Sequence, residues 1–216
     1  EWNQDACNTL VENSKNISVS GVDSWVSIVN PGDVSVRDFS VFNNIDLVAG
    51  GPPCQPFSLG GKHRGMEDKR DMIPQFIRAV REAKPRTFLM ENVKGLTRVS
   101  FSAYLNYSIL QLTYPEIIRK KNQSWEDHLI VLEKIHTSKK KPNSLRYNVL
   151  YRVLNAADYG IAQTRERLFI VGIRSDINAN WAFPEPTHSY QKLHIEQNFT
   201  NEYWKRVSEW ILGVRR

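Results

Sequence analysis

Apolar residues in this 216-residue chain fall into short runs that are separated by polar, turn-rich segments. Three of these runs, residues 45–49, 87–90 and 168–173, have the length and composition of buried strands. Between the first two runs, residues 73–83 carry apolar side chains at the spacing of a helix that packs on a sheet. A strand, a helix and a strand over this distance form a βαβ unit, so the sequence predicts that the first two strands pair in parallel.

The second half of the chain predicts a different arrangement. Alternating side chains over residues 147–154 indicate a strand, and the connection 155–167 is too short to hold a crossover helix, so we expect this strand to pair antiparallel with residues 168–173. Before it, residues 104–112 and 125–135 predict two helices with basic loops around them. The predicted fold class is therefore α/β, with a mostly parallel sheet and an antiparallel strand pair at the end.

Composition narrows the classes of protein that fit. A hydrophobic content of 41% is that of an ordinary globular domain, and the formal net charge of +6 favours a polyanionic partner. No run approaches the roughly 20 apolar residues of a membrane span, and residues 1–5 do not resemble a secretory signal, so we expect a cytoplasmic protein without membrane contact. The two cysteines, Cys7 and Cys54, make no disulfide framework, and the five histidines show no metal-ligand spacing, so we predict no metal site. The sequence also predicts an amphipathic helix over residues 3–13, because apolar residues recur there at helical spacing.

One of the cysteines, Cys54, stands in a loop of glycine and proline directly after the first predicted strand. Ligands of open α/β sheets collect outside the carboxyl ends of the strands, and Glu91, which closes the second strand, is expected at the same edge. A lone cysteine is more often a packed structural residue. The carboxylate, together with the arginine-rich segment 163–167 that opens a further strand, favours a reactive thiol instead. A cysteine hydrolase is disfavoured because no histidine stands out as a partner for the thiol.

Three motifs in order resemble those of the DNA (cytosine-5-)-methyltransferases of bacterial restriction-modification systems. They are Gly51-Pro52-Pro53-Cys54-Gln55-Pro56-Phe57-Ser58, Glu91-Asn92-Val93 and Gln163-Thr164-Arg165-Glu166-Arg167. The resemblance covers about residues 1–96 and 145–189. It implies a Rossmann-like methyltransferase fold, S-adenosyl-L-methionine as cofactor and double-stranded DNA as substrate. The implied reaction methylates carbon 5 of a flipped cytosine through a covalent Cys54 adduct.

The resemblance also implies a role for each matching residue. Cytosine carbon 5 is a poor nucleophile, so a thiolate must first add at carbon 6, and a free cysteine, with a pKa of about 8.5, needs surroundings that favour the thiolate. By resemblance, Glu91 assists at ring nitrogen 3, Arg167 contacts the base and Arg165 orients the site. The implied catalytic residues are thus Cys54, Glu91, Arg165 and Arg167. The implied cofactor contacts are Glu1, Trp2, Asp33, Val34 and Pro53, and the candidate DNA contacts are Gln55, Ser58, Lys62 and Arg64.

The chain also departs from the family pattern. A glycine-rich turn is expected before Glu1, and most of a target-recognition region after residue 189. We therefore expect residues 1–189 to form a partial catalytic domain, with residues 97–145 as a helical excursion, and residues 190–216 to begin the recognition region. Two functions stay open: a methyltransferase that is monomeric when complete, or a truncated, catalytically inert remnant that binds DNA or a partner.

Overall fold

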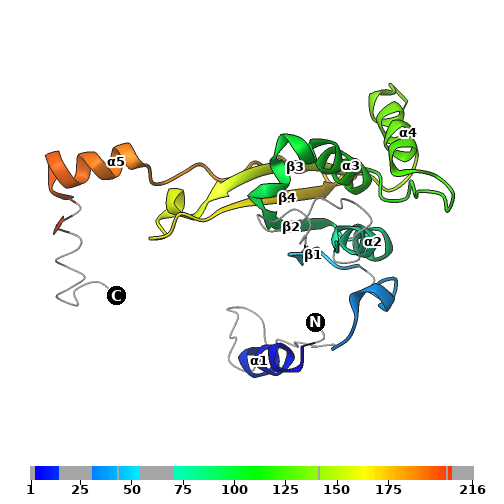
Figure 1. The fold of residues 1–216 in the computed structure, drawn as a ribbon, viewed down its shortest axis with the longest axis horizontal. Helices are drawn as coiled ribbons and strands as arrows, with labels where there is room; N and C mark the ends of the chain where they lie inside the picture. Colours follow the sequence, from blue (N-terminus) through cyan, green and yellow to red (C-terminus); the bar gives the residue numbers. More distant parts are fainter. Residues whose placement is uncertain are drawn as a thin grey trace.

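The computed structural model describes residues 3–14, 31–42, 44–53, 71–140, 142–202 and 204–205. Its centre is an open, mixed sheet with the strand order β1-β2-β4-β3 (Figure 1). The strands are β1 (Leu47–Gly50), β2 (Thr87–Val93), β3 (Tyr147–Asn155) and β4 (Glu166–Arg174). The α/β class expected from the sequence is confirmed.

Strand directions follow the connections between the strands. β1 and β2 run parallel and are joined through helix α2 (Ile73–Ala83), which confirms the predicted βαβ unit. β3 and β4 are antiparallel, as their short connection predicts. β4 is also antiparallel to β2 and lies between β2 and β3, a neighbour relation that the sequence did not indicate. Among the described strands, the parallel part of the sheet is thus the β1–β2 pair.

Helix α2 begins and ends where its sequence requires. Pro74 stands in the first turn, where a missing N–H costs no hydrogen bond. Lys84 adopts the left-handed conformation (φ 47°, ψ 48°) and its N–H donates to the Val80 carbonyl, and Pro85 cannot continue the helix. The buried side of α2 packs against one face of the sheet. The core formed there includes Ile73, Phe76, Ile77, Val80, Phe88, Met90, Leu168 and Ile170.

Two helices follow β2, as predicted, but they differ in their packing. Helix α3 (Ser102–Thr113) contributes Leu105 and Leu112 to the main core. Helix α4 (Trp125–Thr137) packs on α3 around a second, smaller cluster and lies at the end of the sheet (Figure 1). In that cluster His128 is buried, which lowers the pKa of its imidazole. Within residues 97–145, the part that projects from the core is therefore α4.

The remaining elements are short or stand apart from the sheet. Helix α1 (Gln4–Ser14) agrees with the predicted N-terminal helix, and both α1 and α5 (Tyr190–Ile195) lie away from the sheet in Figure 1. In the described part of the chain no helix has the length and apolar character needed to cross a bilayer. Single helical turns are η1 (Val34–Val36), η4 (Lys94–Thr97), η5 (Val99–Phe101), η6 (Ala156–Tyr159) and η7 (Glu196–Thr200).

A glycine in β4 sets the register against β2. Gly172 lies opposite Phe88, and a Cβ atom at Gly172 would stand 2.1 Å from Cε1 of the Phe88 ring. The ring therefore occupies the space that any other residue at position 172 would fill. It also packs edge-on against Tyr147 of β3, with the ring centroids 5.2 Å apart. Phe88 thus spans β4 and joins β2 to β3.

Replacing this glycine tests the register contact. Gly172→Ala is expected to lower the free energy of unfolding by about 1–3 kcal/mol, because the added methyl group overpacks against the Phe88 ring. Urea denaturation of the single variants and of the Gly172→Ala/Phe88→Leu double variant measures the coupling. Gly172→Ala should lower the free energy of unfolding clearly less in the Phe88→Leu background, which lacks the ring. Equal costs in both backgrounds would contradict this account.

Candidate active site

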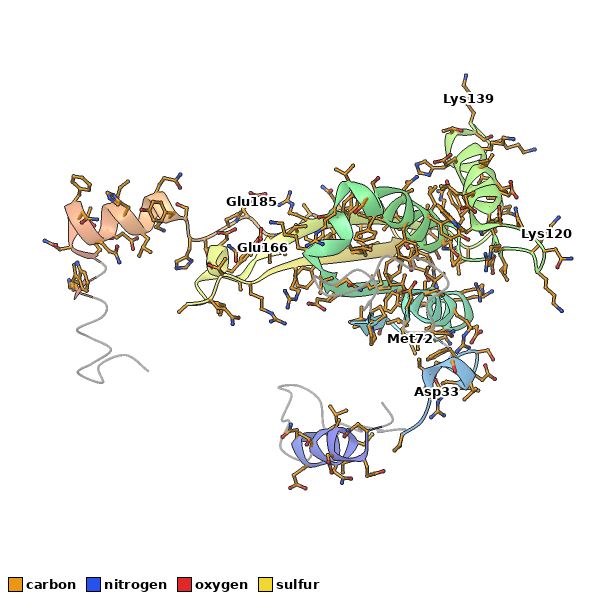
Figure 2. All side chains as sticks on the ribbon, viewed as in Figure 1. Asp33, Met72, Lys120, Lys139, Glu166 and Glu185 are labelled. Carbon is orange, nitrogen blue, oxygen red and sulfur yellow. The ribbon has the colours of Figure 1, made fainter. Side chains whose placement is uncertain are left out.

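All four described strands have an end at one edge of the sheet. β1 and β2 finish there and β4 starts there, because β4 runs opposite to its neighbours. In Figure 2, Glu166 at the start of β4 lies at this edge, and Lys120 and Lys139 beside α4 lie at the other end of the molecule. Several predicted site residues fall outside the described residues: Glu1, Trp2, Cys54, Gln55, Ser58, Lys62 and Arg64.

Glu91 and Arg167 form an ion pair at this edge. Nε of Arg167 lies 3.0 Å from Oε1 of Glu91. Val93 is the residue opposite Arg167, so Glu91 and Arg167 are diagonal neighbours on the same face of the sheet. Their side chains are 39% and 26% exposed, and partly exposed pairs of this kind add little stability. The pair therefore matters mainly because it holds the carboxylate in one orientation.

The Glu91 carboxylate also faces the loop after β1. A Cβ atom at Gly51 would stand 3.2 Å from Oε2 of Glu91, so the glycine allows the carboxylate to approach the backbone. Gly51 belongs to the motif that leads to Cys54, although Cys54 itself is not described. One oxygen of Glu91 is thus held by Arg167 and the other lies beside this loop.

Asn92 is a site residue that sequence reasoning did not single out. Its side chain is 4% exposed, and its Nδ2 donates to the Pro52 carbonyl at 3.1 Å. The Met72 N–H donates to the carbonyl of the next residue, Pro53, at 3.0 Å. Both backbone carbonyls that precede Cys54 are therefore fixed by hydrogen bonds. The sequence signal that could have indicated Asn92 is its polar amide at the end of an apolar strand, next to Glu91.

The structure pairs Glu91 with Arg167 and not with Arg165. Arg165 precedes β4, is exposed, and forms no ion pair with any residue that the structure describes. Its N–H donates to Oδ1 of Asn155 at 3.0 Å, and the same oxygen accepts from Ala157 N at 3.3 Å. Asn155 therefore fixes the chain where β4 begins. The carboxylate of Glu166 is engaged separately, by Lys94 at 2.6 Å.

A cavity of about 500 Å³ brings together the three predicted cofactor residues that the structure describes, Asp33, Val34 and Pro53. Arg78 of α2 holds η1 beside this cavity, because its guanidinium donates to the carbonyls of Val34 at 2.6 Å and Arg37 at 2.7 Å. Figure 2 shows Asp33 at the start of η1 and Met72 next to α2. The other lining residues are Gly32, Phe39, Val48, Ala49, Gly50, Gly51, Pro52, Met72, Gln75, Phe76 and Ala79.

The cavity is apolar with a carboxylate at its rim. Asp33 caps η1 by accepting from Ser35 N at 2.8 Å, and the hydrogen bonds from Ser35 lower the pKa of the Asp33 carboxyl, so it is ionised at neutral pH. At Gly50 a Cβ atom would stand 3.3 Å from the Phe76 ring, so the absence of a side chain keeps this wall open. Among the described residues, no three histidine, cysteine, aspartate or glutamate side chains gather as metal ligands.

Known proteins share the sequence over most of the chain. The sequence model of the family described as C-5 cytosine-specific DNA methylase matches residues 1–113 and 121–209. The Type II methyltransferase M.AquIA of Picosynechococcus sp. is 46% identical over 145 residues, which are 67% of this chain and 49% of that protein. The Type II methyltransferase M.NgoMIV of Neisseria gonorrhoeae is 30% identical over 184 residues, which are 84% of this chain and 49% of that one.

Solved structures also give partial matches to this chain. The methyltransferase EhMeth of Entamoeba histolytica aligns with 88% of this chain and 48% of its own, at 14% identity and a TM-score of 0.46. The chain spans about half the length of the two curated relatives. The family match covers far more than half of the chain and includes the segments that carry Glu91, Arg167 and the cavity. The chain belongs to the family of C-5 cytosine-specific DNA methylases.

Proposed function

We propose that this protein methylates carbon 5 of cytosine in double-stranded DNA, with S-adenosyl-L-methionine as the methyl donor and Cys54 as the nucleophile. The observation that carries the proposal is the position of the Glu91 carboxylate, which is held by Arg167 and faces the loop that leads to Cys54. Family membership and the names of the relatives, which are Type II methyltransferases, support it.

The reaction begins on the base. The Cys54 thiolate adds to carbon 6 of the cytosine, and the electron pair of the 5,6 double bond moves into the ring, so that negative charge develops toward nitrogen 3. Glu91, once it has taken up a proton from solvent, donates this proton or a hydrogen bond at that nitrogen, which stabilises the charge and leaves carbon 5 nucleophilic. When bound, the cofactor would supply an electrophilic methyl group for carbon 5, and its sulfonium sulfur would leave as a neutral thioether. Solvent water then takes the proton from carbon 5, the electron pair left behind re-forms the 5,6 double bond, and the Cys54 sulfur leaves as thiolate.

Each residue at the sheet edge has a separate part in this proposal. Arg167 holds Oε1 of Glu91, so that Oε2 stays directed at the loop side, where the flipped base must enter to meet Cys54. The remaining N–H donors of the Arg167 guanidinium suit the carbonyl oxygen of cytosine. Arg165, which pairs with no carboxylate in the part of the chain that the structure describes, is proposed to orient the site through the turn at the start of β4. Contacts with DNA are proposed for Gln55, Ser58, Lys62 and Arg64.

The cavity fits the proposed cofactor. Its apolar lining suits the flat adenine ring, and the ionised Asp33 carboxylate at the rim suits the amino group of adenine as a hydrogen-bond donor. Val34 is assigned to the adenine edge and Pro53 to the methionine end. Glu1 and Trp2 are proposed, by resemblance, at the ribose and the adenine face.

The domain division is likewise proposed. Residues 1–189 would form part of the catalytic domain, and residues 190–216 the beginning of the target-recognition region. The position of α5, away from the sheet in Figure 1, supports a boundary before Tyr190.

The cofactor assignment can be tested at Asp33. Asp33→Asn keeps an oxygen that can cap Ser35 but loses the charge, so affinity for S-adenosyl-L-methionine should fall by about tenfold, as for the loss of one hydrogen bond to a charged group. Isothermal titration calorimetry measures the change. Asp38→Asn is the matched control, because Asp38 accepts from Ser40 N at 2.9 Å in the same way but does not line the cavity. Equal losses in both variants would reject the assignment.

The catalytic assignment predicts two different losses. In the full-length protein, Cys54→Ala should abolish methyl transfer to duplex DNA, and Glu91→Gln should lower kcat by about 10²–10⁴-fold, the usual contribution of an acid catalyst. Transfer of a radiolabelled methyl group measures both. Glu116→Gln serves as the control, because Glu116 pairs with Lys84 and lies outside the site.

Three results would count against the proposal. Turnover in Cys54→Ala would exclude the covalent route. Full activity in Glu91→Gln would exclude the proposed acid. A full-length protein that binds DNA and transfers no methyl group would favour the inert remnant.

A further inference from the structure

A buried carboxylate lies outside the three motifs and outside the proposed reaction. Asp71 is 6% exposed and stands two residues before Ile73, the first residue of α2. Its Oδ1 accepts from the Ile73 N–H at 3.0 Å, and its Oδ2 accepts from the hydroxyl of Tyr104, which is itself 7% exposed. A carboxylate buried this deeply is stabilised only when its oxygens are hydrogen-bonded. Asp71 therefore ties the start of α2 to α3.

Met72, which lies between Asp71 and Ile73, connects these hydrogen bonds to the sheet edge. Met72 donates its N–H to the Pro53 carbonyl at 3.0 Å, and its own carbonyl accepts from Gln75 N and Phe76 N, both at 3.1 Å. Met72 is thus held by α2 on one side and holds Pro53 on the other. Pro53 is the residue directly before Cys54 in the chain.

We propose that Asp71 and Tyr104 are positioning residues for the methylation reaction. They fix Met72, Met72 fixes Pro53, and the backbone that leads into Cys54 is held in place through the Pro53–Met72 hydrogen bond. This inference rests on the proposed function, because the benefit is the placement of a nucleophile. Small displacements of a reacting group lower the rate far more than they lower substrate binding. The contribution of the pair should therefore be seen in kcat.

Tyr104→Phe removes one hydroxyl from this network. We expect kcat for DNA methylation to fall by about tenfold while KM for DNA changes by less than about twofold. The Met72 amide should also exchange with deuterium about tenfold faster, because the Pro53–Met72 hydrogen bond opens more often. Steady-state kinetics and amide exchange measured by NMR give the two readouts.

Tyr147→Phe is the matched control. Tyr147 is 1% exposed, and its hydroxyl donates to the Pro85 carbonyl at 2.7 Å, at the opposite end of β2 from Glu91. The same chemical change is thus made at an equally buried hydroxyl. A merely structural role for Tyr104 predicts that the two variants behave alike. The proposal predicts similar losses of thermal stability, but a change in kcat and in Met72 exchange only for Tyr104→Phe.

Two substitutions of Asp71 test the same link independently of Tyr104. Asp71→Ala removes both acceptors, whereas Asp71→Asn keeps an oxygen for Ile73 N and presents an amide to the Tyr104 hydroxyl oxygen. We expect the asparagine variant to recover most of the kcat and of the Met72 protection that the alanine variant loses.

Two outcomes would overturn the positioning role. One is unchanged Met72 exchange in Tyr104→Phe, and the other is faster exchange with unchanged kcat. The exchange measurement needs no turnover. An inactive parent protein would therefore overturn the proposed function, while the Met72 amide would still support or overturn the link from Tyr104 to Pro53.

Discussion

The register between β2 and β4 is the constraint on which the site depends. Side chains alternate between the two faces of a strand, so a shift of β4 by one residue would turn Arg167 away from Glu91 and bury a guanidinium in the core. The Phe88 ring prevents this shift, because it needs the one position in β4 that lacks a side chain, Gly172. Packing on the helix-covered face of the sheet thus determines the geometry of the polar groups on the other face.

Rigidity at the sheet edge comes from buried backbone hydrogen bonds more than from charge. The Glu91–Arg167 pair is partly exposed and adds little to stability. The carbonyls of Pro52 and Pro53, in contrast, are held by the buried Asn92 side chain and by the Met72 N–H. A site built in this way keeps its chemical groups open to a substrate while the backbone below them stays fixed.

Spacing and connection rules predicted the βαβ unit, the antiparallel end of the sheet, the helices and the placement of Glu91 at the sheet edge where the loop after β1 begins. They could not predict that β4 lies between β2 and β3, because a connection length restricts direction but not the choice of neighbour. Helix α3 also could not be assigned to the core, since its buried residues lie on several sides and leave no single apolar stripe. Hydrogen bonds between distant residues, such as Tyr104 with Asp71, leave no local pattern in the sequence.

The position of β4 has a consequence for the order in which the protein is assembled during synthesis. The β1–α2–β2 unit emerges from the ribosome before β4, so the edge of β2 that pairs with β4 has no strand partner until residues 166–174 have been made. An uncovered strand edge is a site for wrong pairing, and the segment that holds α3 and α4 is made while this edge of β2 is still uncovered. Arg167 can reach Glu91 only after β4 has paired with β2. A nascent chain therefore contains Glu91 before it contains the arginine that orients this carboxylate, and the ion pair forms only after β4 has joined the sheet.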